Sequence, residues 1–145
     1  MALVTAAMLL VVGAAVAWQA LRRPVGGLGA VRRLVTSNGR FDTGSSGAAT
    51  FARIGNELLA DAKRCQGRHA GPSRPDRRAD GDVRCIARFQ AAAAANVTAV
   101  ALLQCTQPGV FEARRRLLAE LDAIAAVDRD PTHSALPPVP AVPHC

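Results

Sequence analysis

Cysteine thiols are the side chains of this 145-residue sequence with the clearest capacity for covalent chemistry. There are four, Cys65, Cys85, Cys105 and Cys145. An even number of cysteines in a small domain favours disulfide pairing, and disulfides persist in oxidising compartments. The sequence therefore predicts two disulfide bonds and an extracytoplasmic location for the residues that carry them.

Zinc is the alternative use of the same thiols. His69 follows Cys65 by four residues, and further candidate ligands are Cys85, Cys105, His133, His144 and Cys145. Structural zinc sites usually show compact pairs of ligands such as C-x-x-C, and no such pair occurs here. We therefore expect no metal site and no cofactor.

A second chemical pattern lies at residues 41–46, which read Phe-Asp-Thr-Gly-Ser-Ser. This segment resembles the catalytic signature of pepsin-like aspartic peptidases, in which two carboxyl groups share one proton and activate water. The resemblance implies that Asp42 is the catalytic acid and base, oriented by Thr43 and Ser45, in a homodimer that supplies the second Asp. That family places the motif between β-strands, whereas a helical pattern follows here. The alternative is that Asp42, Ser45 or Ser46 caps the next helix.

Three segments have apolar residues at steps of three and four, which is typical of amphipathic helices. In the first, from Ala48 to Gln66, the apolar face is Phe51, Ile54, Leu58, Ala62 and Cys65. In the second, from about Val83 to Cys105, it is Ile86, Phe89, Ala93, Val97 and Val100. In the third, from Gly109 to Val127, it is Val110, Leu117, Leu121, Ile124 and Ala125. Glu112 with Arg116, and Arg116 with Glu120, are spaced for surface ion pairs.

The 17 residues from Gln66 to Asp82 contain three Gly, two Pro and few apolar residues, and they predict a long exposed loop. Its Arg74, Arg77 and Arg78 are expected to be solvated, with anion binding as the alternative.

Helix length restricts the disulfide pairing. Cys85 and Cys105 would lie about 30 Å apart at opposite ends of one helix, and a disulfide needs Cα atoms within roughly 7 Å. Antiparallel first and second helices bring Cys65 to Cys85. Cys105 is left for Cys145, which the extended tail from Pro131 can carry back.

The first part of the chain predicts a membrane segment. Residues Ala2 to Leu21 are uncharged and almost wholly apolar, and about 20 such residues span a bilayer as a helix. The alternative is a cleaved signal peptide with Ala15-Val16-Ala17 as the cleavage site, which would make the protein a secreted one. Retention as an anchor is favoured because no Lys or Arg precedes the stretch.

Two rules disagree about orientation. The basic residues that follow the stretch favour a cytoplasmic domain, and they are Arg22, Arg23, Arg32, Arg33 and Arg40. The cysteines favour the opposite side. We give more weight to the cysteines because their positions fit a bonding scheme.

The expected fold is therefore all-α: an N-terminal transmembrane helix, a small antiparallel three-helix domain and a Pro-rich tail, stapled by disulfides. The expected divisions are an anchor or signal segment (1–23), a basic juxtamembrane linker (24–47), a helical domain (48–130) and the tail (131–145). Residues 25–40 have apolar residues at helical spacing, so the alternative for the linker is a helix lying on the membrane surface.

Composition and local motifs argue against two classes of function, nucleic-acid binding and catalysis. The net charge is +7, but aromatic residues make up 3% of the chain and the arginines are dispersed, which argues against nucleic-acid binding. No Ser, Cys or Lys stands in a local nucleophile motif, so no enzyme is expected.

We expect a non-enzymatic interaction or scaffolding module in the envelope, an accessory subunit of a membrane assembly. Its partners are the membrane, through residues 2–21, and an unidentified protein. The alternatives are the aspartic peptidase and an exported soluble helical protein.

Overall fold

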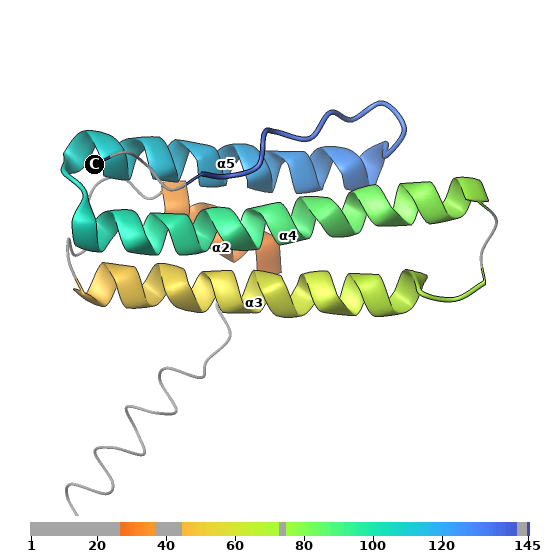
Figure 1. Cartoon of the computed structure of the whole chain (residues 1–145), viewed down its shortest axis with the longest axis horizontal. Helices are drawn as coiled ribbons and strands as arrows, with labels where there is room; N and C mark the ends of the chain where they lie inside the picture. The colour runs from red at the N-terminus through yellow and green to blue at the C-terminus, as the bar shows by residue number, and fades with distance from the viewer. Residues whose placement is uncertain (1–26, 37–44, 73–74, 142–144) are drawn as a thin grey trace, which may run out of the picture.

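A computed structural model describes residues 27–36, 45–72, 75–141 and 145. Within these residues the chain is all-α and contains no strand. The helices are α2 (Gly27–Thr36), α3 (Ser45–His69), α4 (Pro75–Gln104) and α5 (Gln107–Arg129). Figure 1 shows α3, α4 and α5 side by side in alternating directions, with α4 between the other two. The three predicted helices are therefore present and antiparallel, and α2 is a further helix beside them. The segment expected to span the membrane, residues 2–21, lies outside the described residues.

Helix α3 buries the face that its apolar spacing predicts. Phe51, Ile54, Leu58, Ala62 and Cys65 are each no more than 4% exposed. Gly55 lies on the same helix, and a Cβ atom there would come within 2.5 Å of the Asn96 side chain on α4. Small residues therefore allow α3 and α4 to approach closely.

Helix α4 buries a different set of residues from the one expected. Its apolar face was predicted from the larger side chains, but Ile86 is 46% exposed, and Phe89 and Val97 are only partly buried. The buried residues are mostly alanines: Ala87, Ala91, Ala92, Ala94, Ala95, Ala99 and Ala101. The reason is that α4 contacts both α3 and α5, so it has two packed sides. A small side chain on each side lets the helices lie close, and the larger residues are left towards the edges.

The long exposed loop predicted for residues 66–82 is wrong. Helix α3 continues to His69 and α4 begins at Pro75, a residue suited to the first turn of a helix because its ring fixes φ and it needs no N–H partner there. Gly81 is buried within α4 and does not break it. Arg77 and Arg78 are exposed on the first turns of α4, and Arg74 lies outside the described residues.

Helix α5 is close to its prediction. Leu117, Leu121 and Ile124 are buried as expected, whereas Ala125 is exposed and Val110 is half-buried. The buried set continues with Ala113, Glu120, Ala123 and Val127.

Helix α2 falls within the segment expected to be a juxtamembrane linker. Val31 and Val35 are 4% and 1% exposed because they pack into the core, so this face is turned towards the bundle. Two contacts hold α2 on α5: Arg114 Nη2 donates a hydrogen bond to the Val35 carbonyl at 2.8 Å, and Arg32 pairs with Asp122 at 2.9 Å. The described part of the linker is thus a fourth helix of the bundle.

The Pro-rich tail returns along the bundle from the end of α5, as expected (Figure 1). Leu136 packs against the core, and Gln90 Nε2 on α4 donates a hydrogen bond to the Pro137 carbonyl at 3.4 Å. The tail begins with a turn in which Asp130 accepts hydrogen bonds from Thr132 and contacts His133.

Among the described residues, one helical stretch, Arg77–Gln104 of α4, is long and apolar enough to cross a membrane. The core helix of a soluble bundle satisfies the same criterion. Because α4 packs against α3 and α5 and buries its alanines, we assign it to the core of the domain.

Candidate functional site

The four cysteines form two pairs at disulfide distance. Cys65 on α3 faces Cys85 on α4, with their Cα atoms 5.5 Å apart. Cys105, just after α4, faces Cys145 at the end of the tail, with their Cα atoms 4.8 Å apart. This is the pairing expected from helix length. The first pair lies inside both helices rather than at their ends, because α3 runs four residues beyond Cys65 and α4 begins ten residues before Cys85.

A hollow of about 450 Å³ opens beside the Cys65–Cys85 pair. It lies between the last turns of α3 and the first half of α4, and its lining includes His69, Arg78, Asp82 and Phe89. Ligand atoms of Cys65, His69 and Cys85 all lie within 4.8 Å of one another. The structure thus brings together three of the candidate zinc ligands. The other candidates lie elsewhere: Cys105 and Cys145 form the second pair, His133 contacts Asp130, and His144 is outside the described residues.

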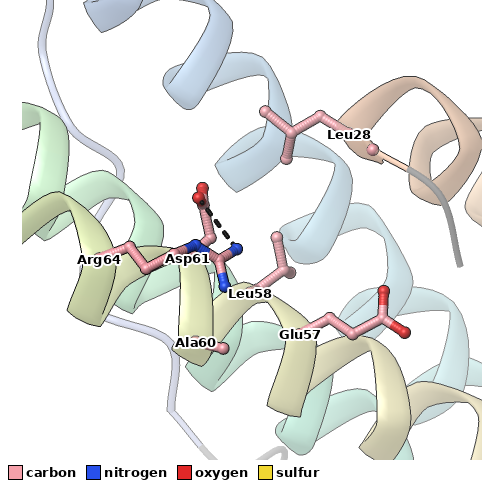
Figure 2. A pocket seen from close by; sticks show the side chains of 7 residues that line it. Leu28, Glu57, Leu58, Ala60, Asp61 and Arg64 are labelled. Atoms are coloured by element: carbon pink, nitrogen blue, oxygen red, sulfur yellow. Dashed lines mark hydrogen bonds and ion pairs between the residues drawn. The ribbon is translucent and has the colours of Figure 1, made fainter. Parts of the chain in front are cut away.

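A second hollow, of about 360 Å³, lies between the start of α2 and the middle of α3. Figure 2 shows Leu28 of α2 on one side of it, and Asp61 and Arg64 of α3 on the other. Arg64 Nη2 lies 3.5 Å from Asp61 Oδ1, at the edge of hydrogen-bond distance. The lining combines apolar side chains with one weak ion pair, and it contains neither a histidine nor a cysteine.

Arg88 on α4 connects three helices. Its Nε donates a hydrogen bond to Asp61 Oδ2 on α3 at 3.0 Å, and its Nη2 donates to Asp128 Oδ2 on α5 at 2.9 Å. The Arg88 side chain is only 12% exposed, whereas the side chains of Asp61 and Asp128 are 31% and 38% exposed, so the guanidinium is shielded from water and the carboxylates are partly hydrated. Local sequence spacing gives no signal for this cluster, because the two partners of Arg88 are 27 and 40 residues away in the chain.

The surface position predicted for Glu120 is wrong. Glu120 was expected to pair with Arg116 on the surface, but it is 1% exposed, and Arg116 instead bonds Glu112 at 3.0 Å. Among the residues that the structure describes, Glu120 Oε2 has no hydrogen-bond partner. Burial raises the pKa of Glu120 to about 7. Glu120 is enclosed in the core and lines neither of the two hollows described above.

The segment that resembles an aspartic peptidase motif spans the start of α3. Ser45 and Ser46 are the first residues of that helix, and Thr50 Oγ1 donates a hydrogen bond to the Ser46 carbonyl within it. Asp42 and Thr43 lie outside the described residues. The residues that follow the motif are helical, whereas the peptidase family has β-strands there.

Comparison with known proteins gives no match: no family model fits the chain, and no curated protein or solved structure matches it.

Proposed function

We propose that this protein is a membrane-tethered envelope module that acts by binding a protein partner, with its helical domain outside the cytoplasm. The observation that carries the proposal is the complete pairing of the cysteines. All four lie at disulfide distance from a partner, at separations of 20 and 40 residues in the chain. Such bonds persist in oxidising compartments.

The tether is the apolar stretch from Ala2 to Leu21, which is long enough for a transmembrane helix. Helix α2 begins at Gly27, only six residues after this stretch, so a retained anchor would hold the bundle close to the membrane surface. The arginines after the stretch favour the cytoplasmic side, and we rank the paired cysteines above them.

Binding fits the surface better than catalysis does. The best-shielded charged cluster, Arg88 with Asp61 and Asp128, joins helices, and Glu120 is enclosed in the core. Large apolar side chains are exposed at the turn between α4 and α5. Leu103 and Phe111 are 62% and 61% exposed there, which makes this end of the bundle the surface we propose for a protein partner.

The tether and its side can be tested in native membranes. We expect the protein to stay in the pellet after a carbonate wash, to keep its N-terminal peptide in mass spectrometry, and to be cleaved by a protease added from outside the cell. A soluble form that begins at Trp18 would identify a cleaved signal peptide. Protection from the external protease, together with four free thiols, would place the domain in the cytoplasm.

The binding surface can be tested with a photo-crosslinking amino acid. Placed at position 111, it should give a discrete crosslinked species in native membranes. Placed at position 116, which is exposed one to two turns further along α5, it should give much less. Equal crosslinking from both positions, or none from either, would argue against a binding surface at the α4–α5 turn.

A further inference from the structure

We propose that Cys65, His69 and Cys85 form a redox-controlled zinc site, which holds Zn²⁺ when the two thiols are reduced and releases it when they form the disulfide. The inference is independent of membrane attachment. It rests on three observations: the convergence of the ligand atoms, the packing of the His69 ring and the adjacent hollow.

The ligand atoms converge from two helices. Cys65 and His69 are four residues apart on α3, so they lie on one face, and Cys85 faces them from α4. Zinc takes Cys sulfur at roughly 2.3 Å and His nitrogen at roughly 2.0 to 2.1 Å, so donors of one tetrahedral site lie within about 4 Å of one another. The donor atoms here lie within 4.8 Å of one another. Small side-chain movements therefore suffice: the sulfurs separate from bonding distance and the imidazole moves inward.

Gly81 gives an independent reason for the position of His69. A Cβ atom at position 81 would lie 2.7 Å from Cγ and Nδ1 of the His69 ring. Glycine within a helix is less favourable than alanine, so its presence here calls for a packing reason. At position 81 it lets the imidazole lie against the backbone of α4, next to Cys85.

The hollow gives the proposed site access to solvent. It is lined by His69, Cys85 and Asp82, so an ion can enter from solvent. Asp82 also lines the hollow, but it is not part of the group of converging donor atoms. The protein donor set is thus two thiolates and one imidazole, with the fourth position of the tetrahedral site open to water from the hollow.

The exchange between the two forms balances with a small thiol, RSH, as the reductant. Two RSH reduce the Cys65–Cys85 bond, giving two protein thiols and one RSSR. Zinc then replaces the two thiol protons, which leave as 2 H⁺. Because the same two sulfurs make either the disulfide or the zinc bonds, the two forms exclude each other. In the reduced chain, zinc would replace the disulfide as the link between α3 and α4.

The test uses the full chain in detergent, reduced with a phosphine and titrated with Zn²⁺ against a chromophoric chelator. We expect one Zn²⁺ per reduced chain and none at this site in the oxidised chain. His69→Ala should weaken binding by at least about 10-fold, the smaller loss seen when even an outer-shell partner of a metal site is removed. His133→Ala is the matched control, and so is the double change Cys105→Ser with Cys145→Ser; both should leave affinity unchanged. Co²⁺ in place of Zn²⁺ should give thiolate charge-transfer absorption that is lost in Cys85→Ser.

Gly81→Ala separates the site from general stability. The added methyl group should displace the His69 ring and weaken zinc binding, although alanine is the better helix former. Gly67→Ala is its control, because a Cβ atom at position 67 meets nothing within 4 Å.

Several results would overturn the proposal. These are absence of zinc binding by the reduced chain, equal affinity in His69→Ala and the unaltered chain, or loss of binding in the Cys105 and Cys145 double variant. If reduction itself unfolds the helices, circular dichroism keeps the test decisive. Zinc must then restore helicity in the unaltered chain and fail to do so in His69→Ala, and any other pattern contradicts the site.

Discussion

Arg88 Nη2 on α4 lies 2.9 Å from Asp128 Oδ2 on α5, and Nη1 of the same guanidinium donates to the other oxygen of that carboxylate at 3.1 Å. This bidentate ion pair joins two helices, and Asp61 extends it to a third. The side chains of Asp61 and Asp128 are 31% and 38% exposed, so each carboxylate stays partly hydrated if the arginine is removed.

We therefore expect Arg88→Met to lower the free energy of unfolding by about 1 to 3 kcal/mol, less than the loss of a partner in a fully buried pair. Arg116→Met is the matched control. It removes an exposed pair with Glu112 within one helix and should cost under about 0.5 kcal/mol. Urea unfolding followed by circular dichroism measures both, and equal losses would show that Arg88 does not link the helices.

Burial of Glu120 predicts that stability falls as pH rises. Its pKa is about 7 in the folded chain and about 4.5 in an exposed glutamate, so between these values the folded state holds a proton that the unfolded state releases. The free energy of unfolding is therefore unaffected by this group below a pH of about 4.5. It falls as the pH rises from about 4.5 to about 7, by up to about 3 kcal/mol in all.

Glu120→Gln should remove this pH dependence and make the protein more stable at pH 8, as measured by urea midpoints from pH 5 to 8. Glu112→Gln changes an exposed glutamate on the same helix and should keep the slope of the unaltered chain. A flat profile in the unaltered chain would mean that Glu120 is hydrated or paired.

The cysteine pairing predicts that either disulfide bond can be removed while the other persists. Cys105→Ser should leave Cys145 as the reactive thiol while the Cys65–Cys85 peptide link persists, as read by non-reducing peptide mapping and thiol labelling. Loop-closure entropy assigns about 3 to 4 kcal/mol to each bond for loops of 20 and 40 residues. A Cys85–Cys105 link in the map would contradict the continuous helix α4.

Close packing of α4 predicts that added volume is harmful in the buried middle of the helix and tolerated at its exposed start. Ala91 is fully buried, so Ala91→Leu should cost about 1 to 3 kcal/mol through overpacking. Ala79 is exposed on the same helix, and Ala79→Leu should be nearly silent. Thermal unfolding of the two variants compares the same chemical change in two environments.

The fold was predictable where a helix has one packed side. The apolar face of α3 follows from spacing alone, because that helix packs mainly against α4. The buried face of α4 does not follow from spacing. This helix packs against two neighbours through small side chains, so its large apolar residues lie at the edges of the contacts and their spacing does not mark the buried face. The Gly and Pro content of residues 66–82 predicts a loop, whereas Pro75 starts a helix and Gly81 accommodates the neighbouring His69 ring.

Features of the site that depend only on helix length and direction were predictable, and features that depend on how two helices are aligned were not. The cysteine pairing needs only helix lengths and directions, which the sequence supplies. The approach of His69 to Cys85 depends on how α3 is aligned along α4 and on the continuation of both helices beyond the Cys65–Cys85 pair. The spacing of residues along the chain gives neither of these. Glu120 was misplaced because an i, i+4 pattern says nothing about which face of α5 meets the core.

Helix α2 lies outside both loops that the cysteine pairs close, since they span residues 65–85 and 105–145. It is held by burial of Val31 and Val35, by the Arg32–Asp122 pair and by the Arg114 hydrogen bond to Val35. A mechanical load applied to the chain before Gly27 therefore reaches these non-covalent contacts before it reaches any cross-link. Under tension α2 would detach first, and the force on the stapled helices would fall until the released segment was fully extended.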